Sequence, residues 1–202
     1  MTSRSLVPVV RKSDITHVKG KARRSRGVPD LRRVLPDEVA GAIEAAGVHG
    51  LLVRFLWTTG ARISEALEVA AGDFDFVAGC VRLRTLKRRG DHFRAVPLPG
   101  PLCGAIAQKI MAEKLGNDSR LWPFTRQHVH AVIRKALLTA GVDAHRARPH
   151  ALRHGHAFHA LASGAPLPVV QKALGHAHVA TTGIYLTATA ADLRASYDRI
   201  VW

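Results

Sequence analysis

Apolar residues in this chain repeat at helical spacing except in one short region, and this change of period limits the possible folds. Across residues 129–140 they recur every three or four positions, as on one face of an α-helix. Across residues 81–85 they alternate with arginines, which indicates a half-buried β-strand, and residues 93–96 provide a return strand. The sequence therefore predicts a mainly α-helical fold with one small antiparallel β-sheet, of the α+β class.

Helix-start and helix-stop signals divide the rest of the chain into short helices. Pro36 is followed by two acidic residues, which favours a helix start, and Gly47 marks the end of that helix. The next helix, which starts near residue 49 and stops at Gly60, is more apolar and should be central to the core, and a third starts at Arg62. Further helices are expected at about residues 102–115 and 125–138, from residue 149, at residues 167–174, around Tyr185 and at residues 190–200.

Composition indicates a globular protein with an anionic partner. The chain has 202 residues, of which 47% are hydrophobic and 22% charged, and a formal net charge of +15. Such an excess favours nucleic acid, with an anionic membrane surface as the alternative. No apolar run approaches the roughly 20 residues that span a bilayer, so no membrane partner is expected. Cys80 and Cys103 are interpreted as small hydrophobes in a strand and a helix of a cytoplasmic protein.

Charge also divides the chain into three parts. Residues 1–33 contain ten Lys or Arg against two Asp and lack apolar periodicity, so residues 1–34 are predicted to be a flexible basic arm. A solvated tail or a truncated linker is the alternative for this arm. Residues 35–186 are predicted to be the globular domain. Residues 187–202 are predicted to form a final amphipathic helix that could dock on a neighbouring protomer.

Two separated stretches carry residues suited to binding a phosphate. His150 and Arg153 lie three residues apart on a predicted helix, and an arginine there can bind phosphate oxygens bidentately. Arg62 follows the break at Gly60 and lies at a helix start, where backbone N–H groups also favour anions. Glu65, three residues later, can hold the Arg62 guanidinium, although the two could equally form a purely structural ion pair.

Tyr185 is the candidate nucleophile. The reference pKa of a phenol is about 10, so Tyr185 needs neighbouring cations or a base to react at neutral pH. His176 could donate a hydrogen bond to the phosphate or assist proton transfer. Lys87, near the tip of the predicted hairpin, could protonate a departing alkoxide, or could simply contact a phosphate or solvent. Tyr197 falls on the apolar stripe of the expected terminal helix and is interpreted as a packing or interface residue.

These motifs, in this order, resemble the catalytic domain of the tyrosine recombinases, the phage integrase family. The resemblance covers about residues 35–186 and rests on Ala61-Arg62-Ile63-Ser64-Glu65-Ala66-Leu67, the basic hairpin ending Val96-Pro97-Leu98, His150-Ala151-Leu152-Arg153-His154, Leu174-Gly175-His176 and Thr181-Thr182-Gly183-Ile184-Tyr185. The sequence most resembles the compact form of this family, which lacks the N-terminal core-binding domain.

The resemblance implies a role for each candidate residue. Arg62 and Arg153 would hold the phosphate, Lys87 would be the general acid, and His150 and His176 would assist by hydrogen bonding or proton transfer. Tyr185 would attack the DNA and form a 3′-phosphotyrosine link, without metal, cofactor or ATP. Counting back from Pro97 would place Arg89 at the lysine position instead, but arginine is a poor proton donor.

The resemblance also implies partners and a setting. These are double-stranded DNA, self-association from dimer to tetrameric synapse, possible accessory DNA-bending proteins, and the bacterial cytoplasm near the nucleoid or a plasmid. A catalytically silent DNA-binding or regulatory protein of the same fold is the alternative function. Additional DNA contacts are expected from hairpin residues and from the basic helix, whose charges could equally form a solvated face. These residues are Arg88, Arg89, Arg126, Arg134 and Lys135.

The abundance of histidine raises the possibility of a zinc site. His150 and His154 have a zinc-like spacing, but His156 and His159 should point away from their helix face. No acidic residue lies between His150 and His154 to activate a water molecule. No metal site is therefore predicted.

Overall fold

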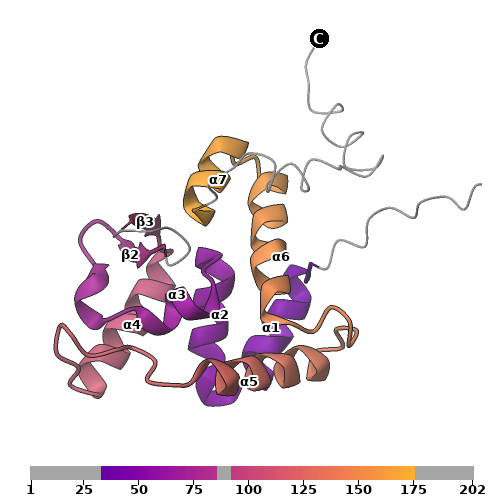
Figure 1. The fold of residues 1–202 in the computed structure, drawn as a ribbon, viewed down its shortest axis with the longest axis horizontal. Helices are drawn as coiled ribbons and strands as arrows, with labels where there is room; N and C mark the ends of the chain where they lie inside the picture. Colours follow the sequence, from indigo (N-terminus) through magenta and orange to yellow (C-terminus); the bar gives the residue numbers. More distant parts are fainter. Residues whose placement is uncertain (1–32, 86–91, 176–202) are drawn as a thin grey trace, which may run out of the picture. The chain divides into compact units, whose positions relative to one another are not determined.

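The computed structural model describes residues 33–85 and 92–175. The chain divides into two units, Met1–Asp30 and Leu31–Trp202, and all described residues belong to the second. Its helices are α1 (Pro36–Ala45), α2 (Gly50–Thr59), α3 (Ile63–Glu68), α4 (Gly100–Ala112), α5 (Arg126–Thr139), α6 (Pro149–Ala162) and α7 (Leu167–Leu174), with 3₁₀ turns η2 (Gly47–His49) and η3 (Ala71–Asp73) (Figure 1). Its strands are β1 (Phe74–Asp75), β2 (Cys80–Arg84) and β3 (Phe93–Pro97). The prediction of a mainly helical α+β fold is confirmed.

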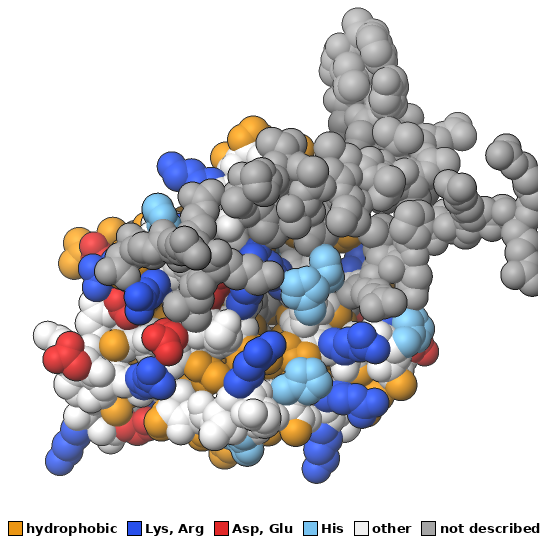
Figure 2. Space-filling model, viewed as in Figure 1, with side chains coloured by type: hydrophobic (Ala, Val, Ile, Leu, Met, Phe, Trp, Pro, Cys, Tyr) orange, Lys and Arg blue, Asp and Glu red, His pale blue; other side chains and the backbone are white. Residues whose placement is uncertain are grey.

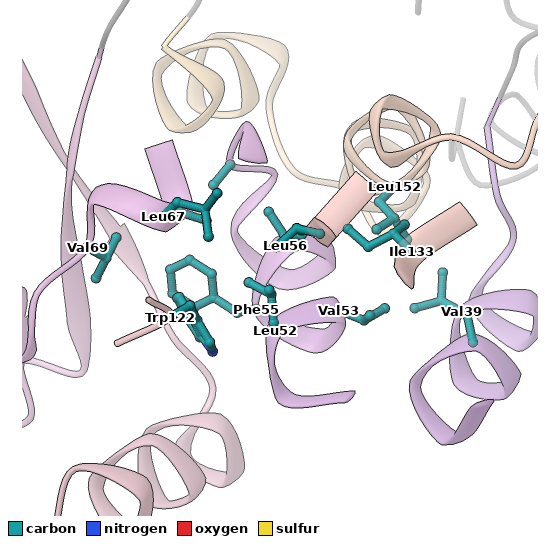
Figure 3. Packing of buried hydrophobic residues seen from close by; sticks show 14 of the residues in the cluster. Val39, Leu52, Val53, Phe55, Leu56, Leu67, Val69, Trp122, Ile133 and Leu152 are labelled. Atoms are coloured by element: carbon teal, nitrogen blue, oxygen red, sulfur yellow. The ribbon is translucent and has the colours of Figure 1, made fainter. Parts of the chain in front are cut away.

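Helix α2 lies at the centre of the core, as its apolar sequence predicts. Leu52, Val53, Phe55 and Leu56 are all buried, and α1, α4 and α6 pack around α2 (Figure 3). Gly60 ends the helix in the left-handed conformation, at φ +61°. Because glycine lacks a Cβ, it adopts this conformation without strain and lets the chain turn sharply into α3.

The sheet has one strand more than the sequence predicted. Its order is β1-β2-β3, all antiparallel, and Val81 of β2 lies opposite Val96 of β3. The expected alternation in β2 is confirmed, since Val81 and Leu83 are buried while Arg82 and Arg84 are exposed. Strand β1 has only two residues, too few for a period to be recognised.

The later helices begin and end close to where the sequence places them. Thr125 caps α5 by accepting a hydrogen bond from the backbone N–H of His128, and Pro149 occupies the first turn of α6. Helix α4 begins at Gly100 and ends at Ala112, two residues before the expected start and three before the expected end. The expected helices around Tyr185 and at residues 190–200 lie outside the described residues. None of the described helices has the length and apolarity of a membrane span.

Helix α7 packs against both α6 and β3, and this packing positions the candidate site. A small apolar cluster of Ala157, Val170 and Leu174 joins α7 to α6. Ala157 has no exposed surface, so its small side chain permits the two helices to approach closely. The C-terminal end of α7 thus lies beside Gly60 at the end of α2, where Leu174 packs against the glycine.

Candidate active site

A strongly basic cavity of about 450 Å³ opens where α3, α5 and α6 meet. Four arginines and two histidines line it, and no acidic residue does. In Figure 2, Lys, Arg and His side chains predominate over the central and right part of the described surface, whereas most acidic side chains in this view lie to the left. The lining residues are Leu56, Ala61, Arg62, Ile63, Ser64, Arg126, His130, Arg148, Pro149, His150 and Arg153. Arg62, His150 and Arg153, which span 91 residues of the sequence, therefore share one cavity, an arrangement suited to an anion.

Arg62 is the N-cap residue of α3, and Glu65 holds it in place. The backbone N–H of Arg62 donates to Oε2 of Glu65 at 3.0 Å, and its Nη1 donates to Oε1 at 2.6 Å. Glu65 has no exposed surface, whereas the Arg62 side chain is 20% exposed and faces the cavity. One buried carboxylate thus fixes both the helix start and the orientation of the guanidinium.

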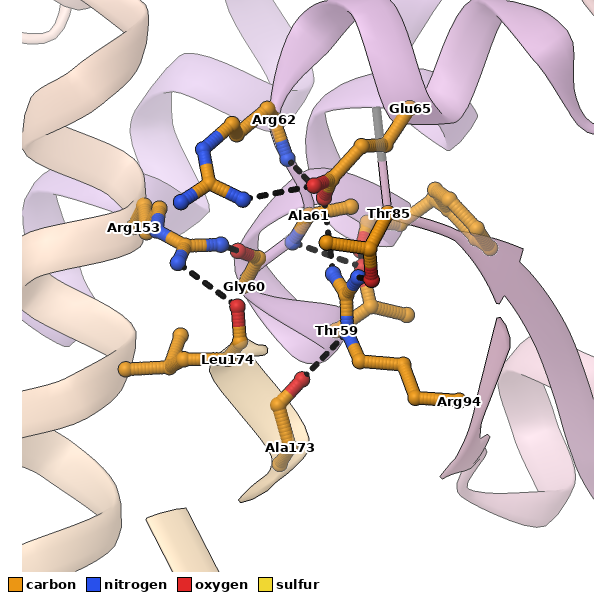
Figure 4. Close-up of polar contacts among 11 residues, drawn as sticks. Thr59, Gly60, Ala61, Arg62, Glu65, Thr85, Arg94, Arg153, Ala173 and Leu174 are labelled. Atoms are coloured by element: carbon orange, nitrogen blue, oxygen red, sulfur yellow. Dashed lines mark hydrogen bonds and ion pairs between the residues drawn. The ribbon is translucent and has the colours of Figure 1, made fainter. Parts of the chain in front are cut away.

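Arg153 is tethered from the opposite side of the cavity. Its residue surface is only 2% exposed, its Nη1 donates to the carbonyl of Gly60 at 2.6 Å, and its Nη2 donates to the carbonyl of Leu174 at 2.7 Å (Figure 4). These bonds connect α6 to the ends of α2 and α7. His150 also lines the cavity, and the centroid of its ring lies 4.4 Å from the ring centroid of His154 in an edge-to-face contact.

Glu65 remains ionised despite its burial. Burial by itself would raise the pKa of the Glu65 carboxyl, but the hydrogen bond and charge of Arg94 and the hydrogen bonds from Arg62 outweigh it. The pKa of Glu65 is therefore lowered from its ordinary value. A single carboxylate is shared by two guanidinium groups, so this part of the site keeps an excess of positive charge.

His156 is a neutral imidazole beside Gly60. Burial lowers its pKa to about 4, and the charges of Arg153 and His159 act in the same direction, against a hydrogen bond to the backbone of Trp57. A Cβ at Gly60 would lie 2.7 Å from Cδ2 of His156, so glycine is also required there for space. No group of three or more potential metal ligands occurs within residues 33–85 and 92–175.

Five of the predicted site residues are not described by the structure, and two others, on α5, do not line the cavity. Lys87, Arg88 and Arg89 fall in residues 86–91, and His176 and Tyr185 fall in residues 176–202, so all five lie outside the described residues. Arg134 and Lys135 are exposed on α5 but do not line the cavity, whereas Arg126 on the same helix does. The catalytic and DNA-binding roles of these residues remain predictions.

Sequence reasoning missed two arginines of the site. Arg148 lines the cavity immediately before α6. Arg94 in β3 is buried and donates to Glu65, Thr85 and the carbonyl of Ala173. The sequence did contain a signal for Arg94. Side chains alternate between the two faces of a strand, so Arg94, two residues before the buried Val96, is expected on the same inner face of the sheet.

The fold and the shared cavity define the class: this is the catalytic-domain fold of the tyrosine recombinases. The chain belongs to the phage integrase family, whose model matches residues 33–192. The resemblance found in the sequence is thereby confirmed.

Individual relatives agree with this membership. Tyrosine recombinase XerD of Corynebacterium glutamicum is 37% identical over 196 residues, covering 82% of this chain and 62% of the relative. The crystal structure of XerA recombinase is similar with a TM-score of 0.71 and 27% identity, covering 84% of this chain and 66% of that one. XerH site-specific recombinase, solved in a pre-cleavage complex with its difH substrate, shares the fold with a TM-score of 0.68 and 22% identity, covering 83% and 54%. The chain spans less than two thirds of each of these proteins.

Proposed function

We propose that this protein is a site-specific DNA recombinase that cuts and rejoins strands through a 3′-phosphotyrosine intermediate. The observation that carries the proposal is the convergence of Arg62, Arg153 and His150 on one basic cavity. Membership of the phage integrase family and the similarity to named tyrosine recombinases support it.

The proposed reaction is a pair of transesterifications. The phenolic oxygen of Tyr185 attacks the scissile phosphorus, the bond to the 5′ oxygen breaks, and Lys87 gives that oxygen a proton. His176 assists by hydrogen bonding or by taking the phenolic proton. The 5′-hydroxyl of a partner strand then attacks the phosphotyrosine and releases Tyr185. One phosphodiester bond is exchanged for another, so the reaction needs no ATP.

The cavity arginines supply the electrostatic part of this mechanism. Negative charge accumulates on the non-bridging oxygens as the pentacoordinate transition state forms, and guanidinium groups fixed in advance stabilise that charge without reorganising. Arg62 is fixed by Glu65, and Arg153 is fixed by the carbonyls of Gly60 and Leu174. Loss of one such donor costs about 10²–10³ in rate in comparable sites.

The proposal includes the way in which protomers assemble on DNA. Residues 35–186 act as the catalytic domain and residues 187–202 dock on a neighbouring protomer, so that dimers on DNA pair into a tetramer, with accessory DNA-bending proteins as further partners. The basic arm of residues 1–34, together with Arg88, Arg89, Arg134 and Lys135, adds phosphate contacts. The proposed setting is the bacterial cytoplasm. Sedimentation of the protein on duplexes with one or two mapped sites tests the order of assembly.

Covalent capture on native DNA tests the activity. The full chain is incubated with DNA of its native replicon in EDTA without ATP, and protein-linked fragments are recovered and sequenced. The proposal expects junctions at a discrete site with protein on the 3′ end, and none with Tyr185→Phe, which should still bind DNA. If the wild-type chain binds DNA but forms no covalent link, the silent DNA-binding protein becomes the better account.

A further inference from the structure

Arg94 is a buried charge that connects three separate segments of the fold. Its side chain is only 7% exposed. Nη2 donates to Oε2 of Glu65 at 2.7 Å, Nη1 to the hydroxyl of Thr85 at 3.1 Å, and Nε to the carbonyl of Ala173 at 2.7 Å (Figure 4). A buried guanidinium needs hydrogen-bond partners and a nearby opposite charge; here each of its three nitrogens donates a hydrogen bond, and one of the acceptors is the Glu65 carboxylate.

Two partners of Arg94 lie just before segments that carry proposed reacting groups. Thr85 is the residue before segment 86–91, which contains Lys87, and Ala173 lies three residues before His176. Glu65, the third partner, holds Arg62. The Arg94 side chain thus contacts a residue next to the Lys87 segment, a residue next to the His176 segment, and the carboxylate that holds Arg62.

Glu65 divides its negative charge between Arg62 and Arg94. Its Oε1 accepts from Nη1 of Arg62, while its Oε2 accepts from Nη2 of Arg94 and from the backbone N–H of Arg62. Without Arg94, the buried carboxylate would pair with Arg62 alone and would offset more of the charge that Arg62 presents to the cavity. Arg94 therefore affects both the orientation and the effective charge of Arg62.

The end of α7 is held by two arginines on successive carbonyls. Arg94 binds the carbonyl of Ala173, and Arg153 binds that of Leu174. These groups are at the C-terminal, negative end of the helix, where no intrahelical donor remains for them. Gly175 follows at φ +65°, and a Cβ there would lie 3.1 Å from Nη1 of Arg94, so the chain passes directly over the guanidinium.

We infer that Arg94 is a positioning residue that aligns Arg62, through Glu65, with the point where the chain leaves α7 towards His176 and Tyr185. This inference rests on the proposed function for its catalytic consequence but not for its structural one. Arg94 lines no part of the cavity that holds Arg62 and Arg153, so it acts on the reaction through its partners.

The test compares two variants, one at Arg94 and one at its partner Thr85, with a matched control at Arg82. All three are made in the full chain. Arg94→Lys keeps the charge, but a single ammonium cannot replace three donors that point in different directions. Thr85→Val removes one acceptor and keeps the guanidinium. Arg82→Gln removes an arginine from the same sheet whose side chain is 61% exposed and pairs only with Asp73 among the described ionic groups.

The first readout is single-turnover formation of the covalent adduct on a mapped duplex, scaled to the folded fraction from circular dichroism. Arg94→Lys should slow the reaction about 100-fold, the effect of misplacing a catalytic group by about 1 Å. Thr85→Val should slow it about tenfold, because one hydrogen bond to a charged group is lost. Arg82→Gln should stay within about twofold of the wild type, as should the affinity of every variant for a random-sequence duplex. A purely structural role would lower the melting temperature without changing the rate of the folded fraction.

The second readout does not depend on catalysis. The Nε–Hε resonances of Arg62 and Arg153 are followed by NMR in the free protein and during titration with inorganic phosphate. Both resonances should shift in Arg94→Lys and stay in place in Arg82→Gln. If the wild type forms no adduct, the proposed function fails while these resonances still decide the inference. Unmoved resonances together with a wild-type rate in Arg94→Lys and Thr85→Val would overturn it.

Discussion

Replacing Glu65 by glutamine tests the buried ionic network most severely. The Glu65 carboxylate has no exposed surface and accepts three hydrogen bonds, two from Arg62 and one from Arg94. Glutamine keeps the shape but presents an amide N–H₂ to one of these donors and leaves two guanidinium groups without a counter-ion. Removing one partner of a buried ion pair costs about 3–5 kcal/mol, and we expect the free energy of unfolding to fall by that amount.

Glu68→Gln is the matched control on the same helix. Glu68 pairs with Arg120, but the two side chains are 39% and 57% exposed. Exposed pairs contribute about 0–1 kcal/mol, so this variant should unfold almost like the wild type. Urea unfolding followed by circular dichroism measures both changes, and an unchanged m-value indicates that the unfolded ensembles are comparable.

The pH dependence distinguishes charge from shape. Because the pKa of Glu65 is lowered in the folded protein, its ionised form stabilises the fold above its ordinary value of 4.5, and that stabilisation is lost as pH falls towards the folded pKa. The stability difference between wild type and Glu65→Gln should therefore be largest near neutral pH and shrink below about pH 4.5. A difference under about 1 kcal/mol at pH 7, or one that does not change with pH, would refute the role assigned to the ionised carboxylate.

The remaining predictions concern the glycine turn and the cavity arginines. Gly60→Ala should destabilise the fold by more than Gly47→Ala: both have positive φ, at +61° and +53°, but only at Gly60 would the new Cβ collide with side chains, those of Leu174 and His156. Left-handed strain alone costs about 1–2 kcal/mol, so thermal unfolding of Gly47→Ala should show that amount and Gly60→Ala visibly more. Arg126→Gln should reduce the slope of log affinity against log salt on duplex DNA by about 1, whereas Arg120→Gln, outside the cavity, should leave it unchanged. An equal slope for both variants would place the DNA away from the cavity.

Local sequence signals predicted most of the fold because several helices have recognisable start or stop residues of their own. The helix expected from Pro149 is α6, and the helix expected to stop at Gly60 is α2. Strand β1 escaped prediction because two residues show no period and its pairing with β2 is a tertiary contact.

Within the site, too, local contacts could be predicted from the sequence and long-range contacts could not. Arg62 and Glu65 are three residues apart, so their contact follows from helical spacing. The arrangement of Arg94 does not, since its partners Glu65 and Ala173 are 29 and 79 residues away. The strand period places Arg94 on the inner face of the sheet, but only the folded chain shows that it meets the buried Glu65 carboxylate there.

Mass spectrometry of the trapped DNA complex tests the central claim most directly. After the reaction in EDTA, nuclease digestion leaves a nucleotide on the attacking residue, and trypsin separates residues 173–194, which contain Tyr185, from residues 195–199, which contain Tyr197. The account predicts a 3′-linked nucleotide on Tyr185 alone, lost in Tyr185→Phe. A nucleotide on Tyr197 or on any other residue, or an adduct that persists in Tyr185→Phe, would contradict it.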